Sequence, residues 1–300
     1  MKKTLLTLLL IMVLFSCNST KKDTILVVST TSIIHNTVQN IAGNLVSTKS
    51  LMGPGIDPHL YKASAGDIAL LNNADIIFYN GLHLEAKMAD ILKKLNAKKP
   101  TIAIGEVIPE SNLLAAEDYD GFHDPHVWFD VQLWVLVTKE ITKQLIKIAP
   151  QHKASFLKNE SNYISQLLEM DQWIKEQVSL IPNERKRLVT AHDAFGYFSK
   201  RYGIHVIGLQ GISTAMQANT KDIQDITNTI IKHNVPTIFI ESSVPVRQIE
   251  AVQAAVQAKG HSVKIGKPLF TDALGSAHQP EGTYIGMMKY NTMQIVNGLK

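Results

Sequence analysis

The tripeptide Asp-Pro-His occurs twice in this sequence, at residues 57–59 and at residues 124–126. Proline fixes its own φ and pushes the residue before it into an extended conformation, so each histidine is expected on a stiff loop. A metal ligand on such a loop loses little conformational freedom when an ion binds. Asp57 and Asp124 could each hold the loop and orient the ring of the histidine that follows, or they could serve ordinary turns. The repeated triplet therefore suggests metal binding by His59 and His126.

Two more side chains that can bind metals follow strands in the second half of the chain. His192, in VTAHDAFGYF, comes directly after a short apolar run, and Asp272, in GKPLFTDALG, follows the last expected strand. His59 and His126 follow the second and fourth expected strands of the first half. Because ligands of parallel α/β sheets bind beyond the carboxyl ends of the strands, we expect all four side chains in a cleft between the two halves. Three imidazoles and one carboxylate would enclose one ion in a four-ligand site suited to Zn²⁺.

Other polar residues are weaker candidates, since most of the 11 histidines are expected at the surface or in packing. His83 and His278 are expected to be structural or to lie near the site. Glu241, at a strand end in FIESS, could accept a hydrogen bond behind a metal ligand or could be structural. His123 could help to capture an ion. Its loop also contains three acidic residues, Glu117, Asp118 and Asp120.

Strands and helices alternate along the chain in two series. Continuous apolar runs such as ILVVST are typical of strands covered on both faces, and Ser64 with Asp67 forms a variant capping box at the start of a helix. In the first half we expect strands at 25–30, 46–52, 75–79 and 101–104, helices at 33–42, 64–74 and 84–95, and a long loop at 105–130. In the second half we expect strands at 188–191, 205–209, 237–241 and 262–265, and helices after the first strand and at 221–233, 246–259 and 282–299.

Two helices, at 131–148 and 151–180, separate the two series and are divided by Pro150. The second helix has a one-sided apolar stripe and, at 1.5 Å per residue, would be about 40 Å long. That length is enough to run along two domains. We therefore predict an α/β protein in which two (β/α)4 lobes with parallel sheets, at 25–150 and 182–300, are joined by a single long backbone helix at 151–181.

Composition limits the classes of function. The chain has 300 residues, and its 45% hydrophobic content is enough for the cores of two modest domains. The net charge of +4 is small, and the lysines are spread evenly along the chain. This distribution is typical of a solvated surface and not of a nucleic-acid groove, so no nucleic-acid partner is expected.

The N-terminus has the features of a secretory signal. Lys2 and Lys3 precede an apolar run at 4–15 that is too short to span a bilayer. The stretch LFSC, which ends at the single cysteine, Cys17, resembles a bacterial lipobox, whose cysteine is acylated. We expect a lipoprotein signal peptide at 1–17, a tether at 18–24 and a lipid-anchored extracytoplasmic protein. The alternative is a plain signal peptidase site with Cys17 as a buried free thiol.

Several longer stretches resemble one family of proteins. GIDPHLYKASAGD, ADIIFYNGLHLE, DPHVWFD, VTAHDAFGYFSKRYG, GLQGIST, FIESS and LFTDALG are similar to segments of the cluster A-I, TroA-like solute-binding lipoproteins of ABC transporters for zinc and manganese, which form periplasmic solute-binding protein family 9. The resemblance extends from about residue 25 to the C-terminus.

The resemblance implies a fold of two (β/α)4 lobes on one long helix, in agreement with the pattern of elements. It also implies that His59, His126, His192 and Asp272 bind one Zn²⁺ or Mn²⁺ ion per chain. An ABC permease and its ATPase would be the partners of a monomeric protein. In manganese-type relatives the third ligand is Glu, so a histidine at position 192 favours zinc.

Two other functions remain as alternatives. A zinc hydrolase would keep three protein ligands and an open position, whereas four protein ligands are expected here, and the sequence has no H-E-x-x-H motif. We therefore expect that the protein is not an enzyme. A surface adhesin is the other alternative, although the sequence has no repeat that would support it.

Overall fold

The computed structural model describes residues 24–116 and 121–300. The expected signal peptide with Cys17, the tether up to residue 23 and the acidic residues Glu117, Asp118 and Asp120 lie outside the described residues. Within the described part of the chain, no helix is both long enough and apolar enough to cross a membrane.

The first half forms a sheet of four parallel strands with the order β2-β1-β3-β4. Side chains of β1 alternate between its two faces: Val27 joins the central core, and Val28 joins a smaller core on the other face. The strands are β1 Leu26–Ser29, β2 Ser47–Ser50, β3 Ile76–Tyr79 and β4 Thr101–Ala103, and the helices are α2 Ser32–Ala42, α3 Ala65–Asn73, α4 Ala89–Asn96 and α5 Val131–Ile148.

The second half repeats this arrangement in a sheet with the order β6-β5-β7-β8. Its strands also pair in parallel, with Leu188 on the central core and Val189 on the outer core. The strands are β5 Arg187–His192, β6 His205–Gln210, β7 Thr237–Ile238 and β8 Lys264–Ile265, and the helices are α7 Gly196–Tyr202, α8 Thr220–Lys232, α9 Arg247–Ala258 and α10 Tyr284–Leu299.

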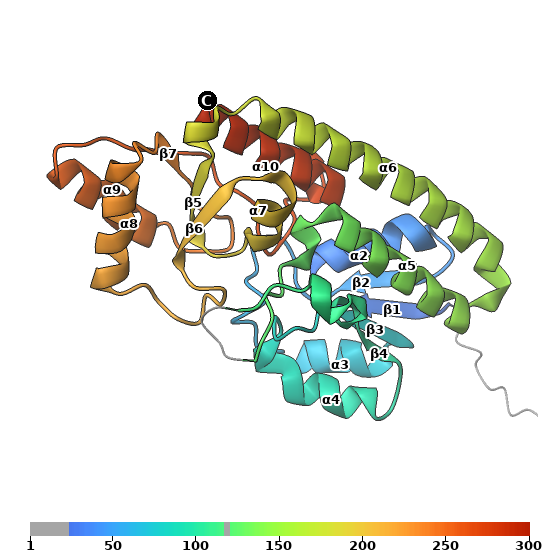
Figure 1. The fold of residues 1–300 in the computed structure, drawn as a ribbon. Coiled ribbons are helices and arrows are strands. Elements are labelled where there is room, and N and C mark those ends of the chain that lie inside the picture. The colour runs from blue at the N-terminus through green and yellow to red at the C-terminus, as the bar shows by residue number, and fades with distance from the viewer. Residues whose placement is uncertain (1–23, 117–120) are drawn as a thin grey trace, which may run out of the picture.

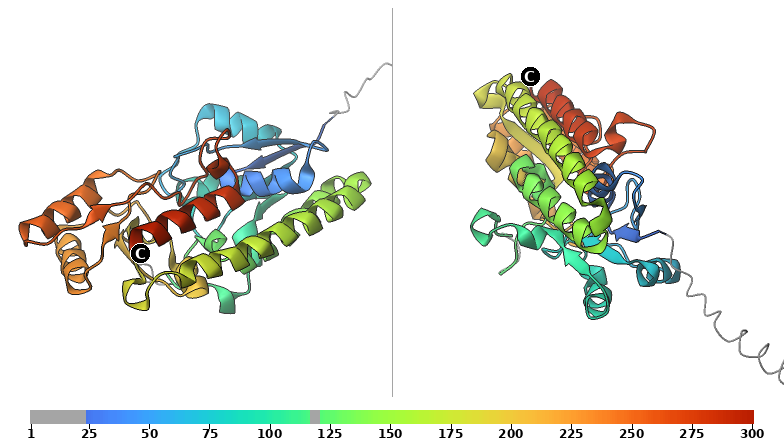
Figure 2. Two further views of the ribbon diagram at one scale, coloured as in Figure 1. Left: turned by 90° about the horizontal axis from the view of Figure 1, so that it is seen from above. Right: turned by 90° about the vertical axis from the view of Figure 1, so that its right-hand side faces the viewer.

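Helix α6, Lys153–Ser179, connects the two lobes and runs along both of them (Figure 1). It has 27 residues, and its apolar stripe is buried as predicted. Helix α10 lies beside α6 (Figure 2) and also contacts α2 of the first lobe. The inner faces of both sheets therefore share one central core with α2, α5, α6, α7 and α10, while α3 with α4, and α8 with α9, cover the outer faces. The predicted fold class is confirmed.

Local structure follows the sequence closely in most places. The capping box at α3 forms as expected, since the Ser64 hydroxyl accepts a hydrogen bond from the Asp67 N–H and the Asp67 carboxylate accepts one from the Ser64 N–H. The strand predicted at 237–241 is shorter in the structure, where β7 ends at Ile238. Glu241 then forms an isolated parallel bridge with Leu269. The predicted loop at 105–130 contains short 3₁₀ turns and one antiparallel bridge, between Ala115 and His123.

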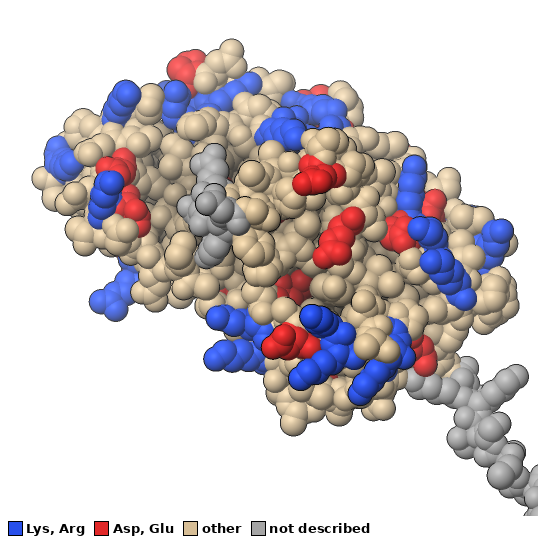
Figure 3. Space-filling model, turned by 60° about the horizontal axis from the view of Figure 1, so that its bottom comes forward, with Lys and Arg blue, Asp and Glu red and all other residues tan. Residues whose placement is uncertain are grey.

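Charged side chains are spread over the surface of both lobes. On the face shown in Figure 3, Lys and Arg side chains lie mainly at the margins, with Asp and Glu between them. This distribution agrees with the small net charge of +4 and with the even spacing of lysines in the sequence.

Asp171 is the charged residue of the buried face of α6, and it connects this helix to α7. Its carboxylate accepts hydrogen bonds from Arg201 Nε at 2.8 Å, from the Tyr202 hydroxyl at 3.0 Å and from Lys175 Nζ at 3.0 Å. Burial alone would raise the pKa of Asp171, but the hydrogen bonds from Arg201 and Lys175 outweigh it and lower the pKa to about 2. The carboxylate is therefore ionised wherever the protein is folded at ordinary pH.

Replacing Asp171 with Asn should lower the free energy of unfolding by about 1–3 kcal/mol at pH 7, because charge-assisted hydrogen bonds to the carboxylate are lost. A carboxyl group with a depressed pKa stabilises the fold above about pH 4, and this contribution is lost as the pH falls toward 2. The difference between variant and wild type in urea denaturation should therefore shrink over that range. Glu169→Gln, on the exposed face of α6, is the control and should change stability by less than about 0.5 kcal/mol. An equal effect of the two substitutions would contradict the assigned role of Asp171.

Candidate metal centre

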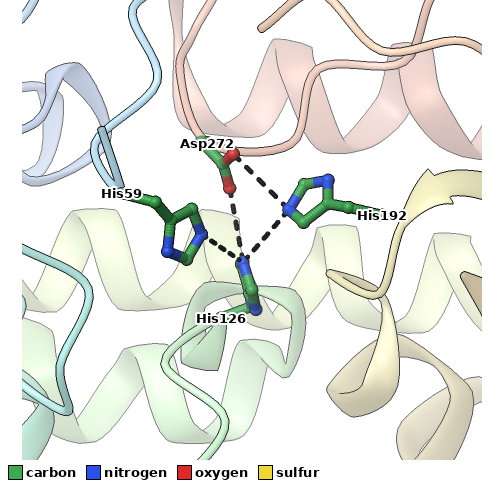
Figure 4. Close-up of side chains that lie close together, drawn as sticks. All are labelled: His59, His126, His192 and Asp272. Carbon is green, nitrogen blue, oxygen red and sulfur yellow. Dashed lines mark hydrogen bonds and ion pairs between the residues drawn. The ribbon is translucent and has the colours of Figure 1, made fainter. Parts of the chain in front are cut away.

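The structure brings the four predicted ligands together between the lobes (Figure 4). His59 comes from the loop between β2 and α3, His126 from the segment before α5, His192 from the last position of β5, and Asp272 from the loop between β8 and α10. All four side chains are buried, and one potential ligand atom of each lies within 4.8 Å of those of the others. Within the described residues they form the one group of three or more such side chains that could hold an ion.

The spacing of the donor atoms matches the requirements of a small cation. His126 Nε2 lies 3.3 Å from His59 Nε2, 3.4 Å from His192 Nε2 and 3.4 Å from Asp272 Oδ1. Asp272 Oδ2 lies 3.5 Å from His192 Nε2. Donor atoms at about 2.0–2.1 Å from a tetrahedral Zn²⁺ ion are about 3.3–3.4 Å apart. The side chains are therefore arranged around a point that an ion of this size could occupy.

One oxygen of Asp272 supports this interpretation. Asp272 Oδ1 is buried and accepts no hydrogen bond from the described residues, although His126 Nε2 approaches it to 3.4 Å. A buried carboxylate oxygen normally accepts a hydrogen bond or binds a metal, because an unpaired buried charge is costly. The donor set of three imidazole nitrogens and one carboxylate oxygen thus fits a divalent transition metal.

Buried carboxylates hold two of the imidazole rings from behind. Asp124 Oδ1 accepts hydrogen bonds from the backbone N–H of His126 at 2.9 Å and from its Nδ1 at 2.7 Å. Glu241 accepts a hydrogen bond from the His192 backbone N–H at 2.8 Å, and its other oxygen pairs with His192 Nδ1. Each carboxylate fixes the tautomer of its ring and turns Nε2 toward the centre of the site.

Asp57 behaves differently from Asp124, although the two tripeptides are identical. Its Oδ1 accepts a hydrogen bond from the His59 backbone N–H at 2.9 Å, and its Oδ2 accepts one from the hydroxyl of Thr214 at 2.6 Å. In the described part of the chain, no hydrogen bond joins Asp57 to the ring of His59. Asp57 therefore holds the loop and links the two lobes, but it does not orient the imidazole.

The sequence pattern did not reveal several residues that support the ligands. The Thr271 hydroxyl donates a hydrogen bond to Glu241 Oε2 at 2.9 Å, and the Asn80 side chain donates one to the carbonyl of Pro125 at 3.0 Å. Ser243 Oγ lies 3.4 Å from Asp272 Oδ2. The position of Thr271 directly before a ligand was the one available signal, since these contacts otherwise depend on the tertiary fold.

The other candidate histidines lie outside the ligand group. His83 and His123 line a cavity of about 150 Å³ together with His59, and the ring of His83 packs against Phe122 at a centroid distance of 4.2 Å. His278 is exposed in the loop before α10. His83 therefore lies near the site, which is one of the two possibilities expected for it from the sequence.

The surroundings shift the pKa values of the three histidine rings in different directions. Burial lowers the pKa of His59 to about 3. Burial would also lower the pKa of His126, but Asp124 and Asp272 outweigh it and raise the value to about 9. In the same way, Glu241 and Asp272 outweigh burial and raise the pKa of His192. The imidazoles in turn lower the pKa of Asp272 against the effect of its burial, so its carboxylate is ionised.

Comparison with known proteins shows one family across nearly the whole chain. The family model for the zinc-uptake complex component A, periplasmic (ZnuA), matches residues 27–298. The zinc-binding protein TroA of Treponema pallidum is 48% identical over 274 residues, which cover 91% of this chain and 88% of the relative. The solved structure of that periplasmic zinc-binding protein has a TM-score of 0.90 at 47% identity and covers 92% of this chain and 99% of its own.

Two further relatives have names that refer to manganese or to transport. The manganese-binding lipoprotein MntA of Bacillus subtilis is 44% identical over 91% of this chain and 89% of its own length. The metal ABC transporter substrate-binding lipoprotein SsaB of Streptococcus sanguinis is 32% identical over 98% of this chain and 97% of its own length.

The different pKa values can be tested in protein from which divalent ions have been removed. At pH 7.5 we expect ¹⁵N chemical shifts of a protonated ring for His126 and of a neutral ring for His59. A raised histidine pKa stabilises the fold below the unfolded value of about 6.5, and the contribution of His126 should be lost as the pH rises from there to about 9. A neutral His126 ring at pH 7.5 would show that Asp124 does not compensate for its burial.

Proposed function

This chain belongs to the zinc-uptake complex component A family, and on that premise we propose that it binds one divalent transition-metal ion outside the cytoplasm and delivers it to an ABC permease for uptake. The observation that carries the proposal is the convergence of four buried donor side chains from both lobes, at spacings suited to one ion. A site assembled from two lobes can release its ion when the lobes move apart, as a carrier requires.

The proposed ligands are His59, His126, His192 and Asp272. Three imidazoles and one carboxylate form a nitrogen-rich set, which suits Zn²⁺ better than Mn²⁺, an ion that prefers carboxylate and carbonyl oxygens. The names of the relatives include both zinc-binding and manganese-binding proteins. We propose Zn²⁺ as the ion, with Mn²⁺ as the alternative outcome of the binding experiment.

Four protein ligands also favour a carrier over a hydrolase. A tetrahedral ion that already has four protein ligands lacks the open position at which catalytic zinc activates water. All four ligands come from one chain, so a monomer is sufficient for binding. An ion held in this way is sequestered and ready for transfer.

The N-terminal features fit delivery at a membrane. We propose that Cys17 is acylated and that residues 18–24 tether lobes at 25–150 and 182–300, joined by the helix at 151–181, to the outer side of a bacterial membrane. A relative that aligns over 97% of its own length is named a substrate-binding lipoprotein of a metal ABC transporter. A tether would keep the protein close to the permease and its ATPase, which we propose as its partners.

Replacing His126 with Ala should weaken Zn²⁺ binding by at least about 100-fold. Structural zinc sites bind with about 10–16 kcal/mol, so one ligand of four is worth about 3 kcal/mol. Competition with a chromophoric chelator, with parallel Mn²⁺ titrations, would measure this loss. The exposed His278 provides the control, and its replacement with Ala should leave the dissociation constant unchanged. A His126→Ala variant with wild-type affinity would refute the ligand assignment.

The two Asp-Pro-His tripeptides allow a matched comparison. Asp124→Asn should weaken Zn²⁺ binding by about 10–100-fold, because the carboxylate that orients His126 loses its charge. Asp57→Asn should cause a smaller loss, since Asp57 contacts only the backbone of His59 and Thr214. The reverse order of the two effects would show that the His59 loop, and not the orientation of the His126 ring, limits affinity.

A further inference from the structure

The segment that contains His126, residues 124–130, precedes the long helix in sequence but is attached to the second lobe at several points. The indole Nε1 of Trp128 donates a hydrogen bond to the carbonyl of Thr271 at 2.9 Å, directly beside the ligand Asp272. The Tyr284 hydroxyl donates one to the carbonyl of Trp128 at 2.6 Å. The phenyl ring of Phe129 packs against Phe195 at a centroid distance of 4.4 Å.

Helix α7 of the second lobe contacts both ends of this segment. Tyr197 and Arg201 are four positions apart and so lie on the same face of the helix. The buried Tyr197 hydroxyl donates a hydrogen bond to the carbonyl of Asp124 at 3.0 Å and accepts one from the Leu114 N–H at 3.1 Å. At the other end, Arg201 Nε lies 3.3 Å from Asp130 Oδ1.

Close approach between α7 and Asp124 depends on a glycine. A Cβ atom at Gly196 would lie 2.7 Å from Asp124 Oδ2, which is too close for an unshifted structure. The first position of α7 is therefore kept free of a side chain where the helix meets the carboxylate that orients His126. Two neighbouring residues of this helix therefore contact Asp124. Gly196 leaves room for its carboxylate, and Tyr197 donates a hydrogen bond to its carbonyl.

We propose that Tyr197 is a positioning residue, which fixes Asp124 from the opposite lobe and through Asp124 holds the ring of His126 in its binding orientation. The inference rests on the proposed metal-binding function and assigns a further residue to the same site. Tyr197 contacts the backbone of Asp124, and the Asp124 carboxylate contacts both the backbone N–H and the Nδ1 of His126. A shift of the Asp124 backbone is therefore transmitted to the ligand ring.

The Tyr197 hydroxyl is the second-lobe group that holds the Asp124 end of the loop. Without it, the buried Asp124 carbonyl and the part-buried Leu114 N–H would each lose a partner, which favours relaxation of the loop. Asn80 holds the neighbouring Pro125 carbonyl from the first lobe. The Asp124 end of the loop would then lose its hydrogen bond to the second lobe, while the loop would remain tied to that lobe beyond His126, through Trp128 and Asp130.

The test is Tyr197→Phe, which removes one oxygen atom and keeps the ring. We expect Zn²⁺ affinity to fall about 10–100-fold, as is typical when the partners behind metal ligands are lost. The matched control is Tyr202→Phe on the same helix, whose hydroxyl bonds to Asp171 and not to the ligand segment. Tyr202→Phe should lower stability but leave Zn²⁺ affinity at the wild-type level.

A second measurement separates positioning from a general loss of stability. In protein stripped of divalent ions, the Nδ1–H proton of His126 should exchange with solvent faster in Tyr197→Phe than in wild type or in Tyr202→Phe. Gly196→Ala, which keeps the hydroxyl but places a methyl group against Asp124, should weaken Zn²⁺ binding in the same direction if Tyr197→Phe does not fold.

The outcomes distinguish a failure of the proposed metal-binding function from a failure of the positioning role of Tyr197. If wild-type protein binds neither Zn²⁺ nor Mn²⁺, the proposed function is wrong, and the role of Tyr197 is refuted with it. If wild type binds Zn²⁺ but Tyr197→Phe keeps its affinity and its slow Nδ1–H exchange, only the positioning role is refuted. Equal losses of affinity in Tyr197→Phe and Tyr202→Phe would likewise refute positioning, because they would reflect stability alone.

Discussion

The pairing of buried imidazole rings with buried carboxylates organises the interior between the two lobes. The rings of His59, His126 and His192 have centroid distances of 5.3–5.9 Å, and all three are buried. Asp272 completes the proposed ligand group, while the carboxylates of Asp124 and Glu241 pair with Nδ1 of His126 and His192. Burying these anions is costly unless each has hydrogen-bond donors. Much of the surrounding structure, including backbone N–H groups and the Thr271 hydroxyl, supplies such donors.

The fold meets this requirement by directing the carboxyl ends of two sheets toward one space. Both sheets have the same strand order, so each lobe directs its loops into the cleft in a similar way. The lobes then use different elements: His192 is part of strand β5, whereas His59 and His126 are in loops stiffened by proline. Asp57, Asn80 and α7 hold the two proline-containing loops, and Glu241 holds His192.

Much of this arrangement could be predicted from the sequence, because the deciding signals were local. Apolar runs and helical stripes defined the two series of elements, and the rule for strand ends placed the four proposed ligands in one cleft. The two Asp-Pro-His tripeptides show what local signals could not predict, because identical residues make different side-chain contacts. Both aspartates bond to the backbone N–H of their histidine at 2.9 Å, but only Asp124 reaches the ring. The other oxygen of Asp57 instead accepts a hydrogen bond from Thr214, 157 residues away, a partner that no local pattern indicates. The contacts of Tyr197 were likewise invisible, since a hydroxyl with a distant carbonyl partner leaves no pattern along the chain, and for Thr271 the one signal was its place directly before Asp272.

Helix α10 has a consequence for the order in which the molecule can assemble. Its first residue, Tyr284, bonds to Asn36 of α2 and to the carbonyl of Trp128, and its ring stacks on Trp134 of α5 at a centroid distance of 5.5 Å. The first lobe therefore lacks part of its own packing until this helix, near the other end of the chain, is in place. Contacts of such long sequence separation form late, because a large loop must close before they are gained. Although the topology contains two lobes, the first lobe therefore completes its core only after the segment that forms α10 has been synthesised and has folded back onto it.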